Sequence, residues 1–109
     1  MNSSLQYLSE IVARANDLLY SKHADIETIM GIIDQSLRNQ GIKADAVSIE
    51  CISVDKKILI LIHDDKPNTV DIILGNKAGD IHSTSEYAMS EMTEAFIIKI
   101  MEKNFIGYS

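Results

Sequence analysis

The sequence has almost none of the residues on which several common architectures depend. Its 109 residues include one cysteine, one proline, two arginines and no tryptophan. A single cysteine excludes an intrachain disulfide, and it excludes any zinc site built on paired Cys-x-x-Cys spacing. Cys51 lies in a segment where apolar and polar residues alternate, so we expect a packed thiol at this position.

Basic residues are also scarce relative to acidic ones. Ten Lys and Arg residues stand against 16 Asp and Glu residues, which gives a formal net charge of -6 at pH 7. Nucleic-acid binding depends on basic side chains that displace counterions from phosphates, and anionic membrane surfaces also attract positive charge. We therefore expect no nucleic-acid partner and no membrane partner, which leaves other proteins.

Long apolar runs are absent as well. The longest uninterrupted run, Ile58 to Ile62, is far shorter than the ~20 residues of a membrane-spanning helix. The first basic residue is Arg14, and no apolar run of the kind found in a signal peptide follows the N-terminus. The sequence therefore predicts a cytoplasmic protein.

Isoleucine, in contrast, is abundant. There are 18 Ile against 8 Leu and 4 Val, and 46% of all residues are hydrophobic. A chain of this length and composition can close one hydrophobic core without disulfides or metals. We expect a single α+β domain spanning residues 1–109.

Two segments near the N-terminus have the periodicity of amphipathic helices. Apolar residues recur at i, i+3, i+4 and i+7 between residues 4 and 22, and again from Ile26 to Leu37. Asp25 is a favourable N-cap for the second segment. The pattern predicts helices over residues 4–22 and 26–39, with Gly31 allowing a close contact inside the second.

The middle of the chain has the patterns of strands. Apolar and polar residues alternate from 46 to 54, and residues 69–74 alternate in the same way. Between them, the strand 57–63 is apolar without alternation, so Leu59 and Leu61 should face away from its main core contacts. Short turns between these segments predict a three-stranded antiparallel sheet with the strand 57–63 in the centre.

The last helix is predicted to be apolar on two sides. Ser83 and Glu86 have the spacing of a capping box, which predicts a long helix from there to Asn104 after a loop over 75–85. Helical steps of 100° place Tyr87, Ile98 and Phe105 opposite the apolar sector that would cover the sheet. The predicted element order is helix, helix, three strands and helix.

These elements carry more apolar surface than one three-stranded sheet can cover. It is covered either by the other helices of a three-layer monomer or by a partner, and symmetric homodimers are the commonest oligomers. We expect a homodimer, or another protein partner, through a surface formed by Leu59, Leu61, Ile73, Tyr87, Ile98 and Phe105.

The predicted function is therefore that of a small acidic protein-interaction module without catalytic activity. In size and charge the chain is similar to small acidic secretion chaperones, which are α+β homodimers. This resemblance implies an alternative function, the chaperone-like binding of a partner protein.

A second alternative is a metal-assisted hydrolase. His63, Asp64 and Asp65 follow the central strand, and Asp80 and His82 lie in the next long loop. Imidazole and carboxylate groups are ligands for zinc or manganese, so convergence of the two loops would create a metal site. The same residues are typical of a solvated turn that protects an apolar strand from edge-to-edge aggregation. His63, Asp65 and His82 are thus candidate ligands only, and we expect no metal and no cofactor.

Overall fold

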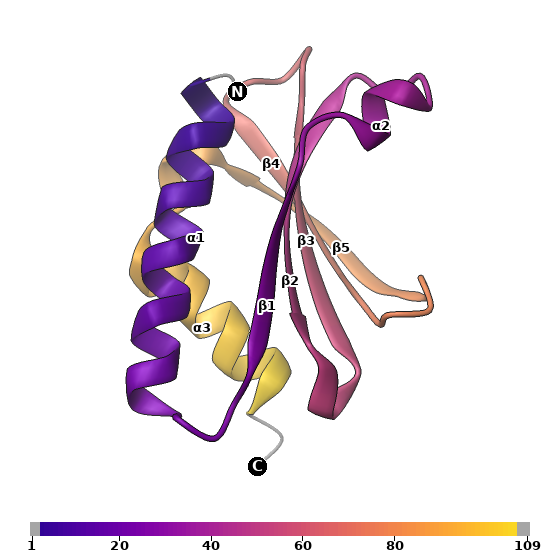
Figure 1. Cartoon of the computed structure of the whole chain (residues 1–109). Coiled ribbons are helices and arrows are strands. Elements are labelled where there is room, and N and C mark those ends of the chain that lie inside the picture. The colour runs from indigo at the N-terminus through magenta and orange to yellow at the C-terminus, as the bar shows by residue number, and fades with distance from the viewer. Residues whose placement is uncertain (1–2, 107–109) are drawn as a thin grey trace.

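Two helices cover one side of a five-stranded antiparallel sheet (Figure 1). The computed structural model describes residues 3–106. Within this range the class is α+β, as the sequence predicts. The helices and strands are, in chain order, α1 (Ser3–Lys22), β1 (Thr28–Ile33), α2 (Ser36–Asn39), β2 (Ala44–Cys51), β3 (Lys56–His63), β4 (Thr69–Gly75), β5 (Ile81–Ala88) and α3 (Glu94–Phe105).

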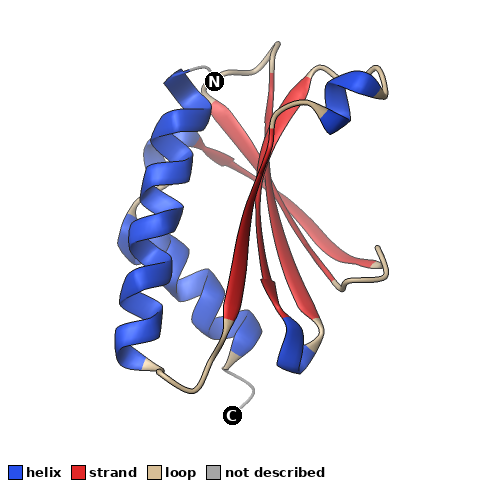
Figure 2. Cartoon of the chain, viewed as in Figure 1, coloured by secondary structure: helices blue, strands red, loops and turns tan. Residues whose placement is uncertain are grey.

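The strands lie in the sheet in the same order as in the chain, and every neighbouring pair is antiparallel. β3 is therefore central, which confirms the prediction for the strand 57–63. The three-stranded sheet is wrong, because β1 and β5 extend it on either side. Figure 2 shows these two strands as the edges of the sheet.

β1 lies inside the segment 26–39, which was predicted to be a helix, and takes up six of its fourteen residues. Its residues pair with β2 along the whole strand, and Met30 lies opposite Ile49. β-Branched residues such as isoleucine are enriched in strands, and helical spacing over so short a segment is ambiguous. Pairing with β2 decided the outcome, and only the four residues of α2 remain helical.

Gly31 makes a close contact, but between strands and not between helices. It lies opposite Ser48 of β2. A Cβ atom at this position would be 2.9 Å from Ser48 Oγ, closer than real Cβ contacts. The absence of a side chain therefore lets β1 approach β2 with Ser48 in place.

β5 and a 3-10 turn (Met89–Glu91) occupy the predicted start of the C-terminal helix. Ser83 and Glu86, read as a capping box, are exposed residues of β5. The same polar residues suit an exposed edge strand, so the sequence pattern was ambiguous. α3 begins only after Thr93, whose hydroxyl accepts a hydrogen bond from the backbone N–H of Phe96 at 3.2 Å.

The hydrophobic core lies between the two long helices and the face of the sheet that they cover. α1 and α3 contact each other and share this face. Fully buried side chains come from both layers: Leu5, Leu8, Val12, Leu19, Val47, Ile49, Ile58, Ile60, Ile97, Met101 and Phe105. No helix among residues 3–106 is long and apolar enough to cross a lipid bilayer.

Glu102 of α3 ties the two helices together at the end of α1. Its Oε2 atom lies 3.0 Å from His23 Nε2 and 3.2 Å from Lys22 Nζ. The hydrogen bond with His23, followed by that with Lys22, lowers the pKa of Glu102 from its ordinary value of 4.5. The ionised form is therefore stabilised in the folded state.

Glu102→Gln should lower the stability of the fold in a pH-dependent way. Because the pKa of Glu102 is lower in the folded state than in the unfolded state, its ion pairs stabilise the fold fully above the unfolded-state pKa. This stabilisation is lost as the pH falls through the folded-state pKa. Because the groups are partly exposed, we expect less than about 1 kcal/mol at neutral pH. Thermal melts from neutral to strongly acidic pH measure the stability difference between Glu102→Gln and wild type, with exposed Glu10→Gln as the control. A difference from wild type that persists unchanged in strong acid would contradict this assignment.

Phe105→Ala should be strongly destabilising, because the ring is 1% exposed within the core. Truncation of a buried Phe costs about 3–5 kcal/mol through lost burial and a residual cavity. Leu59→Ala, on the half-buried opposite face of the sheet, is the comparison, with a smaller loss of about 1 kcal/mol. Urea unfolding should show that Phe105→Ala loses more free energy of unfolding than Leu59→Ala. Equal losses in the two variants would argue against the buried placement of Phe105.

Candidate functional site

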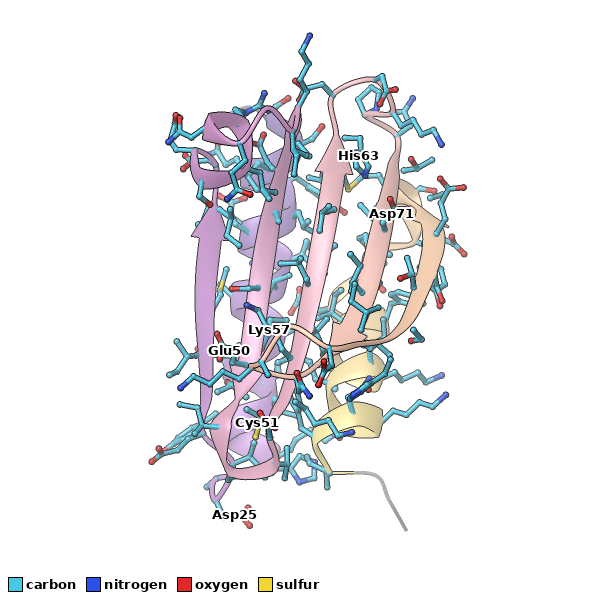
Figure 3. The ribbon with its side chains drawn as sticks, turned by 90° about the vertical axis from the view of Figure 1, so that its right-hand side faces the viewer. Asp25, Glu50, Cys51, Lys57, His63 and Asp71 are labelled. Carbon is cyan, nitrogen blue, oxygen red and sulfur yellow. The ribbon has the colours of Figure 1, made fainter. Side chains whose placement is uncertain are left out.

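The face of the sheet that points away from α1 and α3 carries no second layer in the described chain, apart from α2 at one end and the β4–β5 hairpin, which crosses the other end (Figure 3). We call it the open face. Strand register arranges its residues in rows across the sheet. The rows are Ile33, Ala46, Leu61, Asp71 and Glu86; Gly31, Ser48, Leu59, Ile73 and Thr84; and Ile29, Glu50, Lys57 and Gly75.

Aliphatic side chains form the centre of the open face. Leu59 lies opposite Ile73, and Leu61 follows two residues later on β3. All three are half-buried, while their neighbours on β3, such as Ile60, are buried under the helices. This confirms that Leu59 and Leu61 lie on the face opposite the core.

β1 adds two isoleucines to this face that the sequence pattern did not reveal. Ile33 is half-buried and Ile29 is exposed, and both were expected on a helix. The signal that would have found them is the uncharged, β-branched composition of residues 28–33, which favours a strand.

Charged pairs stand at the two ends of the open face. Glu50 Oε1 lies 3.9 Å from Lys57 Nζ at one end, and His63 Nε2 lies 3.0 Å from Asp71 Oδ2 at the other (Figure 3). All four side chains are partly exposed, so solvent weakens these pairs. Their effect is to frame the aliphatic centre with polar groups.

Arg38 fixes α2 to the end of the sheet. Its guanidinium binds the buried carboxylate of Asp45 through Nε and Nη2, both at 3.0 Å. It also binds Asp64 through Nη1 and Nη2, both at 2.8 Å. These hydrogen bonds lower the pKa of Asp64 and raise the pKa of Arg38. Asp64 is therefore engaged in a structural pair at the turn after β3.

The β4–β5 hairpin encloses a small hollow at the other end of the open face. The hollow has a volume of about 190 Å³. Leu59 and Ile73 of the sheet and Ile81 of the hairpin line it with apolar surface, and Lys57 and Lys77 are the basic lining residues. The hairpin is held by the backbone N–H of Asn76, which donates to the carbonyl of Asp80 at 3.1 Å, and by the N–H of Lys77, which donates to the Asp55 carboxylate at 3.3 Å.

The candidate metal ligands do not come together. His63 lies at the end of β3 opposite Ala44, whereas His82 lies beside Gly75, which pairs with Lys57 at the start of β3. Six strand residues separate these ends by about 20 Å. Asp64 is bound to Arg38, Asp65 is an exposed turn residue, and Asp80 accepts a hydrogen bond from Asn76. No group of three His, Cys, Asp or Glu residues able to hold a metal ion occurs within residues 3–106.

The six predicted interface residues divide between the two faces of the sheet. Leu59, Leu61 and Ile73 gather on the open face. The other three lie on the helix-covered side, where Tyr87 stacks edge-on against Phe96 with ring centroids 5.0 Å apart, Ile98 is partly buried against the core, and Phe105 is fully buried. They were grouped because residues 83–104 were expected to form one helix.

The chain has no match among protein-family models, and neither curated proteins nor solved structures give a significant match.

Gly75→Ala should disturb the hairpin that encloses the hollow. A Cβ atom at Gly75 would overlap the backbone carbonyl of Asp80, whose position is fixed by the hydrogen bond to Asn76. Such a steric conflict costs about 1–3 kcal/mol. Hydrogen exchange at β4 and β5 should accelerate, while exposed Ala78→Ser should leave it unchanged. Unaltered exchange in Gly75→Ala would contradict the close approach.

Proposed function

We propose that the protein is a protein-interaction module that binds a partner polypeptide on the open face and has no catalytic activity. The observation that carries the proposal is the group formed by Leu59, Leu61 and Ile73, which is aliphatic and half-exposed at the centre of a face without a covering layer. Removal of apolar surface from water contributes about 25 cal/mol per Å². A partner therefore gains the most binding free energy by placing aliphatic side chains against these three residues.

Charge favours a basic rim on that partner. The chain has a net charge of -6. The strand residues of the open face include Glu50, Asp71 and Glu86 against Lys57. Lys66 lies 3.6 Å from Glu86 and Lys77 lines the hairpin hollow, so the preference for a basic partner depends mainly on the net charge. Opposite potentials across an interface accelerate association and disfavour wrong partners. The partner that fits best has an aliphatic centre flanked by Lys or Arg.

The same argument disfavours a face-to-face homodimer. Two open faces of the same acidic protein would bring carboxylates of one copy toward carboxylates of the other, which is unfavourable. We therefore assign the open face to a different polypeptide, in agreement with the alternative of a chaperone-like binder.

Two synthetic amphipathic peptides test this assignment. Both carry the same leucine stripe, and the polar positions beside it are lysine in one peptide and glutamate in the other. We expect the lysine peptide to bind roughly tenfold more tightly, equivalent to ~1.4 kcal/mol. In an NMR titration it should shift the methyl signals of Leu59, Leu61 and Ile73.

A matched pair of leucine variants locates the binding surface. Leu61→Gln removes an aliphatic side chain from the open face and should weaken binding of the lysine peptide roughly tenfold. Leu18→Gln changes an exposed leucine of α1 and should have no effect. Equal affinity for both peptides would overturn the charge argument, and methyl shifts confined to α1 or α3 would overturn the placement.

A further inference from the structure

The two edge strands of the sheet are built in opposite ways. β5 is exposed over residues 81–86, is mostly polar, and pairs with β4 through a register shift at Leu74 and Gly75. Irregular pairing and polar side chains are the means by which natural sheets protect a free edge. β1 has no charged residue and no proline, and its pairing with β2 is regular over all six residues. Its outer edge therefore lacks these protections.

Exposed apolar side chains gather along β1. Four of the eight large apolar residues that are exposed within residues 3–106 lie on or beside this strand: Tyr20, Ile29, Ile32 and Ile52. Tyr20 lines one hollow with Ile29, and Ile52 lines another with the same residue. Exposed apolar side chains gathered along one edge are typical of an interaction site.

We infer that β1 pairs antiparallel with β1 of a second copy about a twofold axis at Gly31, which joins two five-stranded sheets into one. A twofold axis perpendicular to the sheet keeps the open faces of both copies on the same side. Each residue then pairs with a residue of the same face, as antiparallel pairing requires.

The sequence of β1 favours this one register. An axis at Gly31 places Ile29 opposite the second copy's Ile33 on the open face, and Met30 opposite its Ile32 on the helix side. These pairs are apolar, and such cross-strand pairs stabilise a sheet. At each end of the strand, Thr28 lies opposite the second copy's Asp34. An axis one residue earlier, at Met30, would instead place Glu27 opposite an isoleucine.

A second copy is the occupant that the charges permit. Two proteins of net charge -6 repel each other where carboxylates meet. The segment 28–33 contributes no carboxylate to the seam, and the nearest ones, Glu27 and Asp34, lie at its two ends. The free edge supplies backbone N–H and C=O groups to its partner, as in other cases of strand addition. A six-residue strand is about 20 Å long, so the seam is a small interface typical of a micromolar dimer.

Sedimentation equilibrium with a matched pair of edge variants tests the dimer. The wild type should have twice the mass of the 12.1 kDa chain at tens of micromolar. Ile29→Lys should weaken the dimer roughly tenfold or more. Ile81→Lys changes an isoleucine of the other edge that is 65% exposed, against 56% for Ile29, and should leave the dimer intact. A monomeric wild type, or a dimer that Ile29→Lys does not weaken, would overturn the inference.

Cysteine cross-linking tests the register independently of how the lysine variant folds. Opposed residues of antiparallel strands lie about 4.5–5.5 Å apart between Cα atoms, within reach of a disulfide. A mixture of Ile29→Cys and Ile33→Cys proteins should therefore form a covalent heterodimer under oxidation. Each variant alone should not, because its own equivalent positions lie four residues apart along the seam, and Cys51 is buried. Absence of the mixed product would reject the axis at Gly31. Loss of dimer in Leu61→Gln, with Ile29→Lys unaffected, would assign self-association to the open face instead.

Discussion

The structure depends on a strand that is apolar on both sides. β3 turns Ile58, Ile60 and Ile62 toward the helices and Leu59 and Leu61 away from them. Such a strand is stable only inside a sheet, where neighbours on both edges satisfy its backbone and where at least one face is covered. β2 and β4 supply the two neighbours, and α1 and α3 cover one face. The second face of β3 is left with two leucines and no covering layer in the described chain, and the candidate site follows from this asymmetry.

We propose that charge assigns the open face and the β1 edge to different partners. The open face combines an aliphatic centre with carboxylates at its rim, which suits a basic polypeptide better than a copy of the same protein. β1 itself carries no charged residue, so in a β1–β1 dimer carboxylates would approach each other only at the two ends of the strand, where Glu27 and Asp34 lie. A sheet joined along this edge would place two open faces on one side and offer the partner a surface of twice the width.

Much of the candidate site was foreseeable, and the missing part has a simple cause. The uninterrupted apolar run placed Leu59 and Leu61 on the second face of a central strand, which the structure confirms. Tyr87, Ile98 and Phe105 were added because one helix was expected over 83–104. The structure divides that segment between β5, a 3-10 turn and α3, so these residues fall on the covered side. The His and Asp loops could not be located from the sequence, because only strand register shows that they lie at opposite ends of the sheet.

The sequence by itself determined the α+β class, the first helix, the central strand and its two neighbours. Each has a periodic pattern long enough, or an apolar run distinctive enough, to exclude other structures. Only the tertiary structure decided the two edge strands, because their residues are compatible with a helix as well as a strand when taken alone. β1 exists because its isoleucines pair with β2, with Gly31 allowing the close approach to Ser48. β5 forms because β4 pairs with the segment 81–88, whose first six residues are exposed and have no buried apolar stripe that a helix would need.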